Sequence, residues 1–572
     1  MYILGLSSYA HEATCSLIKD GAIRIVLEQE RLNREKHTWK FPKEAIEQCL
    51  DFEGITMDDV DHITFFWNPI AEIYSNLGHV IRYFPTSLKL LTSDSGAEGL
   101  TFLNRVKAMH GIGTAIQKQF SLVQKPKVEF IEHHMCHAAS CFFVSEFKEA
   151  AILVLDGRGE SASMTIAIGK DNHIQKIMDI KVPHSVGHLY ACITDYLGFT
   201  PFYDEWKVMG LSAYGKDTYC KDFEDVVQLT ADGGYRLNLK YFDFHTHGRS
   251  KWLSDFFIKK FGPKRAKNDP YDQRFLDISY ALQRLVEKIG VHLANHLYAV
   301  TKSPNLCMAG GVILNCLMNE EIVKKTPFKN FFIQPLANDA GASLGAALYY
   351  YHQTLNKPRT YTFDSAYLGG EFTNEQIEKV LSGYKVRFHR SSNIAQETAK
   401  HIAQGKIVGW FQGRMEAGPR ALGNRSIVVD PSDATMKDKL NSRVKKREFF
   451  RPFAPSVLEE KVAQYFDMPK QQPSPHMILT GKVKVDKKSV IPAVTHIDGT
   501  ARVQTVSKKT NLRYWQLISE FERIKGIPVL LNTSFNENEP IVYTPKDAVE
   551  CFLRTEFDVL AIGDFLVQKN YQ

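Results

Sequence analysis

The chain has 572 residues, which is too long for one ordinary hydrophobic core, so we expect two or three domains. Its hydrophobic and charged fractions, 44% and 24%, are those of a water-soluble globular protein. A net charge of +7 over this length is too weak to predict nucleic-acid binding, although it suits substrates that carry phosphate.

The cysteines and the apolar runs predict a cytoplasmic protein. The nine cysteines are scattered without a CxxC pair, which is typical of reduced thiols. The first residues lack the basic leader of a signal peptide, and no apolar run approaches the ~20 residues of a membrane helix. We therefore expect no membrane partner and no nucleic-acid partner, and we leave open whether the chain forms a homodimer.

The first 30 residues predict three antiparallel strands, because short apolar runs are separated by a turn signal at Asp20-Gly21. The same order of strands and turns recurs about 150 residues later, beginning near Ile152. Helical periodicity follows the two copies, over residues 41–52 and 185–197. The repeated pattern predicts an internal duplication.

Two aromatic-rich segments, residues 70–120 and 234–275, interrupt the duplicated pattern. We interpret both as insertions, which are reasonable places for substrate selectivity. A long amphipathic helix over residues 276–299 and a buried strand over residues 305–308 follow the second insertion.

The regular helix and strand patterns are absent over residues 353–363, where we place a linker. The domains are therefore predicted at residues 1–352 and 363–572. The elements predicted after the linker are helices over 374–382 and 393–404, and strands over 384–388, 407–411, 528–531 and, as the last strand, 559–562.

Two histidines suggest a metal site. His133 and His137 follow a short apolar strand and stand four residues apart in a predicted helix, so they share one face, whereas His134 lies about 100° round the axis. Two converging imidazoles commonly hold a first-row divalent metal. A helix start with buried, hydrogen-bonded histidines would give the same pattern.

Two carboxylates strengthen the metal hypothesis. Asp156 ends an apolar strand beside Gly157, and Asp339 stands just before a helix of small residues. A simple glycine turn would explain Asp156 equally well. Two imidazoles with two carboxylates suit iron, manganese or zinc rather than calcium.

A glycine pair and an early turn are candidates for nucleotide binding. Gly310-Gly311 lies between a strand and a helix start, where bare backbone favours a phosphate or a sugar. The segment is not GxGxxG, so it does not predict a dinucleotide site. His11-Glu12 stands where a duplicated nucleotide-binding core presents its first phosphate loop, although alone it fits a surface turn better.

The second half places cations among glycines and aromatic residues. Arg451 lies between aromatic residues and prolines, whereas Lys446-Arg447 fits a solvated face better. Guanidinium groups bind phosphate bidentately, so we expect a buried site for a small anion. Interleaved arginine and phenylalanine could also stack on RNA, but these arginines form no continuous stripe.

The ordered motifs resemble those of the ATP-dependent O-carbamoyltransferases of antibiotic and nodulation-factor biosynthesis, over essentially the whole chain. The motifs are HEATCSLIKDG, EQERLNREKH, EHHMCHAAS, LDGRGE, KVMGLSAYG, AGGVILN, NDAGASLG, GRMEAGPRALGNRS, VKKREFFRPFAPS, THIDGTARVQTV and LNTSFNENEPIV. The resemblance implies the α/β class, with an N-terminal Kae1-like domain of the duplicated actin/Hsp70 type and a C-terminal YrdC-like domain.

The resemblance also implies a role for individual residues. The metal ligands would be His133, His137, Asp156 and Asp339, with Fe²⁺ expected first and Mn²⁺ or Zn²⁺ as alternatives. The ATP and carbamoyl-adenylate contacts would be Lys207, Gly310, Gly311, Asn315 and Asp339. The carbamoyl-phosphate contacts would be Arg420, Lys445, Arg451, Arg502, Asn532 and Ser534. The residues acting in catalysis would be His11, Lys36 and Arg451.

The reaction implied by the resemblance has two parts. Carbamoyl phosphate would give carbamate in the second domain, and carbamate would attack ATP, supplied with Mg²⁺, to form carbamoyl-adenylate in the first. A hydroxyl of a small natural product or sugar would then receive the carbamoyl group, with His11 as general base. The alternatives are an enzyme of tRNA threonylcarbamoyl-adenosine synthesis and an ATP-binding module without catalytic activity.

Overall fold

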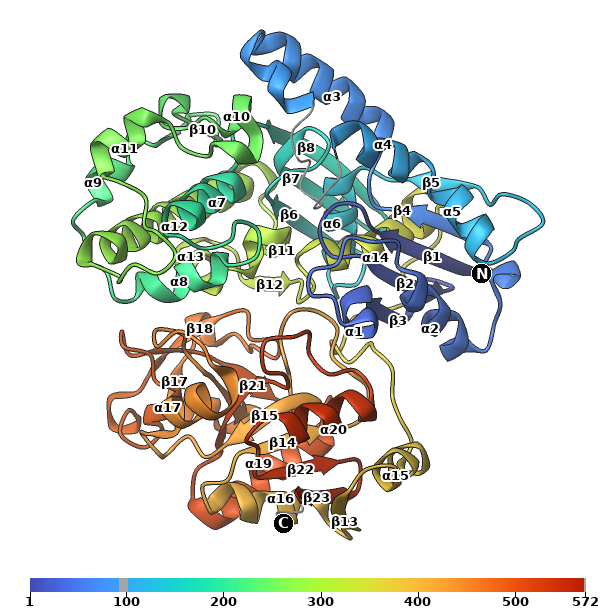
Figure 1. Ribbon diagram of the computed structural model, residues 1–572. Coiled ribbons are helices and arrows are strands. Elements are labelled where there is room, and N and C mark those ends of the chain that lie inside the picture. Colours follow the sequence, from blue (N-terminus) through green and yellow to red (C-terminus); the bar gives the residue numbers. More distant parts are fainter. Residues whose placement is uncertain (92–100, 570–572) are drawn as a thin grey trace. The chain divides into compact units, whose positions relative to one another are not determined.

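The structure is a computed structural model that describes residues 1–91 and 101–569 (Figure 1). The chain divides into two compact units. Unit 1 contains Met1–Glu30 and His37–Phe363, and unit 2 contains Arg31–Lys36 and the chain from Asp364 onward. The described helices include none that is long and apolar enough to cross a membrane.

Unit 1 contains two five-stranded sheets with the same topology. In the first, the order is β3-β2-β1-β4-β5, and in the second it is β8-β7-β6-β11-β12. In each, the first three strands are antiparallel and the last two extend the sheet in parallel from its first strand. The strands are β1 (Tyr2–Ser7), β2 (Thr14–Lys19), β3 (Ala22–Glu28), β4 (His62–Phe65), β5 (Val128–Phe130), β6 (Glu149–Leu155), β7 (Ala162–Lys170), β8 (His173–Lys181), β11 (Asn305–Ala309) and β12 (Asn330–Ile333). This repeat confirms the predicted duplication.

Two helices form the centre of unit 1. Helix α6 (His133–Phe142) packs against β6 and β11, α14 (Asp339–Tyr349) packs against β1 and β2, and the two helices pack against each other. Gly345 permits their close approach, because a Cβ atom there would lie 1.8 Å from the carbonyl oxygen of Cys136. The helix pair therefore joins the two halves of the duplicated core.

Helices follow each copy as predicted, namely α2 (Lys43–Glu53) and α7 (Val186–Tyr196). The predicted long helix is α12 (Gln273–Thr301), a few residues longer at each end. The first insertion is helical where it is described, with α3 (Pro69–Arg82), η2 (Thr86–Leu91), α4 (Phe102–His110) and α5 (Ile112–Gln119). Residues 92–100 of the predicted insertion lie outside the described residues. The second insertion contains β10 (Tyr235–Leu237), α10 (Phe244–His247) and α11 (Asp255–Phe261).

Unit 2 is built on an eight-stranded mixed sheet of order β13-β23-β22-β14-β15-β21-β16-β20. Its strands are β13 (Val386–Arg390), β14 (Val408–Phe411), β15 (Arg425–Val429), β16 (Ala454–Leu458), β20 (Gln504–Val506), β21 (Val529–Ser534), β22 (Val559–Ile562) and β23 (Phe565–Lys569). The helices include α15 (Asn374–Ser382), α16 (Ile394–Ala403), α19 (Leu512–Lys525) and α20 (Pro545–Arg554). A small sheet of β17 (Phe466–Asp467), β18 (Thr480–Val483) and β19 (Thr500–Arg502) completes it.

One prediction for unit 2, the identity of its last strand, is wrong. The strand predicted over residues 559–562 is β22, but it is not the last, because β23 pairs with it in an antiparallel hairpin. Only Gly563-Asp564 separates the two strands, so the turn is too short to interrupt the apolar pattern. The α/β class predicted for both halves is confirmed.

Candidate metal centre and anion cluster

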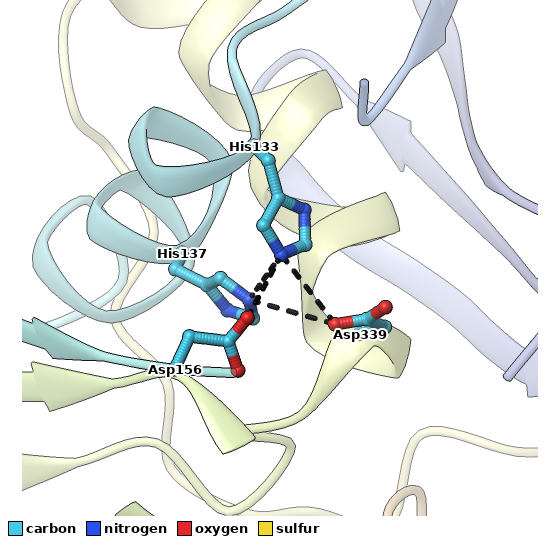
Figure 2. Close-up of side chains that lie close together, drawn as sticks. All are labelled: His133, His137, Asp156 and Asp339. Carbon is cyan, nitrogen blue, oxygen red and sulfur yellow. Dashed lines mark hydrogen bonds and ion pairs between the residues drawn. The ribbon is translucent and has the colours of Figure 1, made fainter. Parts of the chain in front are cut away.

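Helix α6 presents two histidines to one point, as their spacing predicts. The helix begins at His133, so His133 and His137 lie one turn apart on the same face. Their Nε2 atoms are 3.1 Å apart, and both side chains are fully buried (Figure 2). His134 turns elsewhere, with its Nδ1 atom 2.9 Å from the hydroxyl of Thr165.

Two carboxylates complete the cluster from other elements. Asp156 follows the end of β6, and its Oδ2 atom lies 3.3 Å from Nε2 of His133. Asp339 is the first residue of α14 rather than the residue before it, and its Oδ1 atom lies 3.5 Å from Nε2 of His133 and 3.7 Å from Nε2 of His137. Figure 2 shows the four side chains pointing toward one another.

The donor set of these four residues, hereafter the quartet, fits a first-row divalent ion. One ligand atom from each residue lies within 4.8 Å of all the others. Donors bound about 2.0–2.2 Å from one ion lie roughly 3–3.5 Å apart, close to the separations found here. Two nitrogens and two oxygens suit iron, manganese or zinc. The structure therefore contains a candidate metal site, as the sequence suggests.

Electrostatics in the quartet favour a cation. Burial lowers the pKa of His133, but the carboxylates of Asp339 and Asp156 outweigh it and raise this pKa to about 9. Burial alone would raise the pKa of Asp156, yet the neighbouring histidines hold it well below its usual range. The two carboxylates thus draw positive charge into a buried site, which a bound divalent ion would supply.

Two neighbouring groups hold the quartet in place. The Glu160 carboxylate accepts hydrogen bonds from the backbone nitrogens of Asn68 (2.7 Å) and His133 (3.1 Å), at the start of α6. The backbone nitrogen of Gly311 donates to Oδ1 of Asp156 at 2.7 Å. Gly310 has a φ of +100°, and a Cβ atom there would lie 2.4 Å from the carbonyl oxygen of Leu155, so only glycine fits. The glycine pair therefore orients a carboxylate of the quartet.

The other residues expected to contact nucleotide already have partners in unit 1. The side chain of Asn315 caps α13 (Cys316–Lys325) by accepting from the backbone nitrogen of Met318 at 3.0 Å, and it also bonds to Gln283. The ammonium group of Lys207 is 3.0 Å from a carboxylate oxygen of Asp204. Their roles toward nucleotide stay predictions.

His11 lies in the turn between β1 and β2, in a half-buried aromatic setting. Its ring centroid is 5.1 Å from that of Phe202. Burial lowers the pKa of His11 to about 4, with Asp339 opposing the shift, so the imidazole is neutral near pH 7. The structure places His11 in unit 1 and Lys36 in unit 2, where Lys36 Nζ donates to the carbonyl oxygen of Asn538 at 3.3 Å.

Lys445 is held by oxygen atoms of unit 2 itself. Its buried ammonium group donates to the carbonyl oxygens of Ser534 (2.6 Å) and Asn536 (2.7 Å) and to the Asn536 side chain (2.6 Å). Burial, reinforced by Arg447, lowers its pKa well below the usual range. This arrangement ties the segment before Lys446 to the end of β21.

The arginines of unit 2 form a second cluster. Burial first, and then the positive charges of Arg451 and Arg502, lower the pKa of Arg447 well below its usual range. The Arg447 guanidinium lies 4.1 Å from the ring centroid of Phe453, and its Nε donates to Asn441 at 3.0 Å. We name Arg447, Arg451 and Arg502 the arginine cluster. Glu448, 3.4 Å from Arg451, opposes this shift of the Arg447 pKa, but the three cations outnumber it and form a setting that favours an anion.

The prediction of a solvated face at Lys446-Arg447 is therefore correct for Lys446 and wrong for Arg447. Lys446 is exposed and pairs with Glu537 at 2.9 Å, as a solvated residue does. Arg447 instead turns inward, because Phe453 and Asn441 provide a ring and an acceptor for its guanidinium. Its Nη2 atom is buried without a hydrogen-bond partner among the described residues.

The remaining predicted anion contacts lie on β21 and in the glycine-rich loop before β15. The amide nitrogen of Asn532 donates to Gln504 at 2.9 Å and to the carbonyl oxygen of Ala421 at 3.1 Å. Its Oδ1 atom is buried with no partner among the described residues. Ser534 ends β21, and Arg420 is half-buried in the loop.

Sequence reasoning missed Glu416, which organises that loop. Its buried carboxylate accepts from the backbone nitrogens of Leu422 (2.5 Å), Asn424 (3.2 Å) and Arg425 (3.2 Å). A lone acid within a run of glycines and arginines was the available signal, because a carboxylate there can collect several backbone donors.

Comparison with known proteins decides the family. A profile described as the carbamoyltransferase N-terminus matches residues 2–348, and one described as the carbamoyltransferase C-terminus matches residues 399–569. The chain belongs to the carbamoyltransferase family. The matches span most of both units, so the whole chain is that of a carbamoyltransferase enzyme.

Relatives of this carbamoyltransferase cover most of its length. It is 40% identical over 607 residues to a Synechocystis protein, with 100% of this chain and 97% of the relative covered. Nodulation protein NolNO of Sinorhizobium fredii is 36% identical over 583 residues, covering 99% and 80%. Nodulation protein NolO of Bradyrhizobium diazoefficiens is 40% identical over 447 residues, covering 77% and 79%.

Solved structures resemble the carbamoyltransferase only distantly. Component A of (R)-2-hydroxyglutaryl-CoA dehydratase from Acidaminococcus fermentans is 14% identical, with a TM-score of 0.31, and covers 62% of this chain and 99% of its own. The HypF protein of T. kodakarensis is 11% identical, also with a TM-score of 0.31, over 62% and 48%.

Proposed function

We propose that this carbamoyltransferase uses ATP and carbamoyl phosphate to form carbamoyl-adenylate and transfers the carbamoyl group to a hydroxyl of a small molecule. The quartet of unit 1 and the arginine cluster of unit 2 support the proposal, because they suit a cation and an anion respectively. A natural product or a sugar is the expected acceptor class.

Unit 2 is suited to the first step. Water attacks the carbonyl carbon of carbamoyl phosphate, the bond from that carbon to the bridging oxygen breaks, and phosphate leaves while carbamate remains. Negative charge gathers on the departing phosphate, and the guanidinium groups of Arg447, Arg451 and Arg502 stabilise it. Oδ1 of Asn532 adds a hydrogen-bond acceptor for the carbamoyl amide.

Unit 1 is suited to the second step. A carbamate oxygen attacks the α-phosphorus of ATP, and pyrophosphate leaves. When bound by the quartet, Fe²⁺, Mn²⁺ or Zn²⁺ supplies positive charge for the phosphates, and Mg²⁺ accompanies ATP. The acceptor hydroxyl then attacks the carbonyl carbon and AMP leaves. His11 is neutral and can accept the hydroxyl proton.

The observation that carries the proposal is the quartet, since four buried potential ligands from three elements converge on one point. Exchange of labelled pyrophosphate into ATP tests it. We expect exchange that needs carbamoyl phosphate but neither threonine, bicarbonate nor tRNA. Strict dependence on threonine would contradict the proposal and favour threonylcarbamoyl-adenylate synthesis.

A further inference from the structure

Helix α3 is amphipathic in an unusual sense, because polar residues such as Glu72 and Asn76 face the protein while large apolar residues face outward. Glu72 is fully buried, accepts from the indole nitrogen of Trp67 at 2.8 Å, and pairs with Arg105. One turn on, the side-chain oxygen of Asn76 accepts from Arg158 at 2.7 Å. A surface helix normally places its apolar residues against the core, so the composition of the opposite face calls for a partner.

The outward side of α3 is apolar. Five large side chains there are 45–72% exposed and recur at the spacing of one helical face: Ile70, Ile73, Tyr74, Leu77 and Ile81. Phe84 and Leu88 are exposed just after the helix, and Leu103 is exposed on α4, which packs against α3 as does η2, the element of Leu88. We name these eight residues the apolar face. Figure 1 shows α3 at the outer edge of unit 1.

The apolar face exceeds the ordinary background of exposed apolar residues. Among the described residues, nine of the twenty exposed large hydrophobic side chains belong to residues 69–127, about a tenth of the chain. Scattered single residues need no partner, whereas a gathered set marks a binding surface.

The exposed charges on the elements that carry the apolar face are positive. In the described part of residues 69–127, Glu72 is the only acidic residue, and it is buried against Arg105. Arg82 on α3, Lys89 on η2 and Lys107 on α4 are exposed. An apolar surface on elements that also present lysine and arginine matches an anionic lipid surface, where side chains enter the acyl boundary and cations meet the headgroups.

We propose that the apolar face of α3 and its basic surroundings bind the surface of an anionic lipid membrane. With 14 residues, α3 is too short to span a bilayer but long enough to lie in its interface. The sequence predicts no membrane partner because it has no apolar run long enough to span a bilayer, and binding at the membrane surface does not need such a run. A second copy of the chain fits less well, because two such insertions would bring like charges together without exposed described acids between them.

Sedimentation with vesicles tests the proposal on the purified 572-residue chain. We expect binding to phosphatidylcholine vesicles that contain phosphatidylglycerol, weaker binding to phosphatidylcholine alone, and weakening by salt. Ile73→Gln with Leu77→Gln should lower binding by about tenfold or more, since it removes two apolar anchors. Arg82→Gln with Lys89→Gln should lower binding to the anionic vesicles several-fold.

Matched controls separate this effect from general damage. Val485→Gln with Ile497→Gln removes two exposed apolar side chains from unit 2 and should leave binding unchanged. The thermal unfolding midpoint of the α3 variant should equal that of the wild type, because its changed side chains are exposed. Three results would overturn the proposal. The wild-type protein could bind neither kind of vesicle, or the control variant could lose as much vesicle binding as the α3 variant. The third is a wild-type dimer that becomes a monomer in the α3 variant.

Discussion

The quartet of unit 1 and the arginine cluster of unit 2 are opposite electrostatic designs. In the quartet, two carboxylates raise the pKa of His133 to about 9. In the arginine cluster, burial and like charges lower the pKa of Arg447 well below its usual range. The carboxylates of the first site favour a cation and the guanidinium groups of the second favour an anion, so the two units suit different ligands of one reaction.

The two sites also differ in how their residues are held. Three separate elements place the quartet, whereas the cluster depends on the segment near Lys445, which is fixed by oxygen atoms at the end of β21. Variants that affect one site should therefore leave the other intact.

Loss of the metal is the largest expected effect. His133→Ala with His137→Ala should reduce the content from about one first-row metal ion per chain to nearly none, because half of the donor set is removed. Plasma mass spectrometry of the purified protein measures it. His134→Gln is the matched control and should keep the metal, since that ring bonds to Thr165 instead. An unchanged content in the double variant would remove the quartet assignment.

Arg451→Ala should affect only the anion side. We expect kcat/KM for carbamoyl phosphate to fall about 100-fold or more, because the variant loses a charge-assisted hydrogen bond to the substrate and one positive charge. ATP binding should stay near the wild-type level. Steady-state kinetics and calorimetry measure the two.

Arg443→Gln serves as the control for Arg451→Ala. Arg443 pairs with Glu556 and Asp558 at distances of 3.2 and 3.1 Å, so its loss should leave carbamoyl-phosphate use close to normal. Loss of ATP binding in Arg451→Ala would show that the division of labour between the units is wrong.

Lys445→Met tests whether that ammonium group is structural. It should lower the free energy of unfolding of unit 2 by about 2 kcal/mol, because buried carbonyl oxygens lose their donor. Lys446→Met, one residue on and exposed, should change it by less than about 0.5 kcal/mol. Urea unfolding followed by fluorescence measures both. Normal stability together with lost phosphate binding would place the ammonium on the ligand.

The effect that is smallest at neutral pH concerns a buried histidine outside the quartet. Burial lowers the pKa of His352 to about 4 from 6.5, opposite to the shift of His133. The unfolded chain therefore binds a proton first, and this group reduces stability as pH falls from about 6.5 to 4, by at most about 1.4 kcal/mol per pH unit. His352→Gln should flatten the acid side of the unfolding curve. Identical curves for both proteins would contradict the shift.

The positions of the quartet were predictable because each depends on a short-range rule. Four-residue spacing places His133 and His137 on one face, and the two carboxylates stand at the junctions of strands and helices. The three antiparallel strands that begin each half of unit 1 were likewise visible as a repeat.

Long-range packing hides the rest. The Nη2 atom of Arg447 is buried and its guanidinium packs on Phe453 and bonds to Asn441, and a Lys-Arg pair in a sequence does not reveal which member turns inward. Arg34 belongs to unit 2 because it donates to the carbonyl oxygens of Pro540 and Ile541, about 500 residues away in the sequence. No local pattern encodes either pairing.

Trapping of the activated carbamoyl group with hydroxylamine distinguishes transfer through carbamoyl-adenylate from other routes. The protein is incubated with labelled carbamoyl phosphate, ATP and hydroxylamine, which attacks carbamoyl-adenylate to give hydroxyurea and AMP, and a protein-free blank corrects for the hydroxyurea that carbamoyl phosphate and its breakdown product cyanate form without enzyme. Above that blank, we predict labelled hydroxyurea and AMP in equal amounts from the wild-type protein, and neither from His133→Ala with His137→Ala. Labelled hydroxyurea that forms above the blank without AMP, or equally in the double variant, would contradict formation of carbamoyl-adenylate in unit 1.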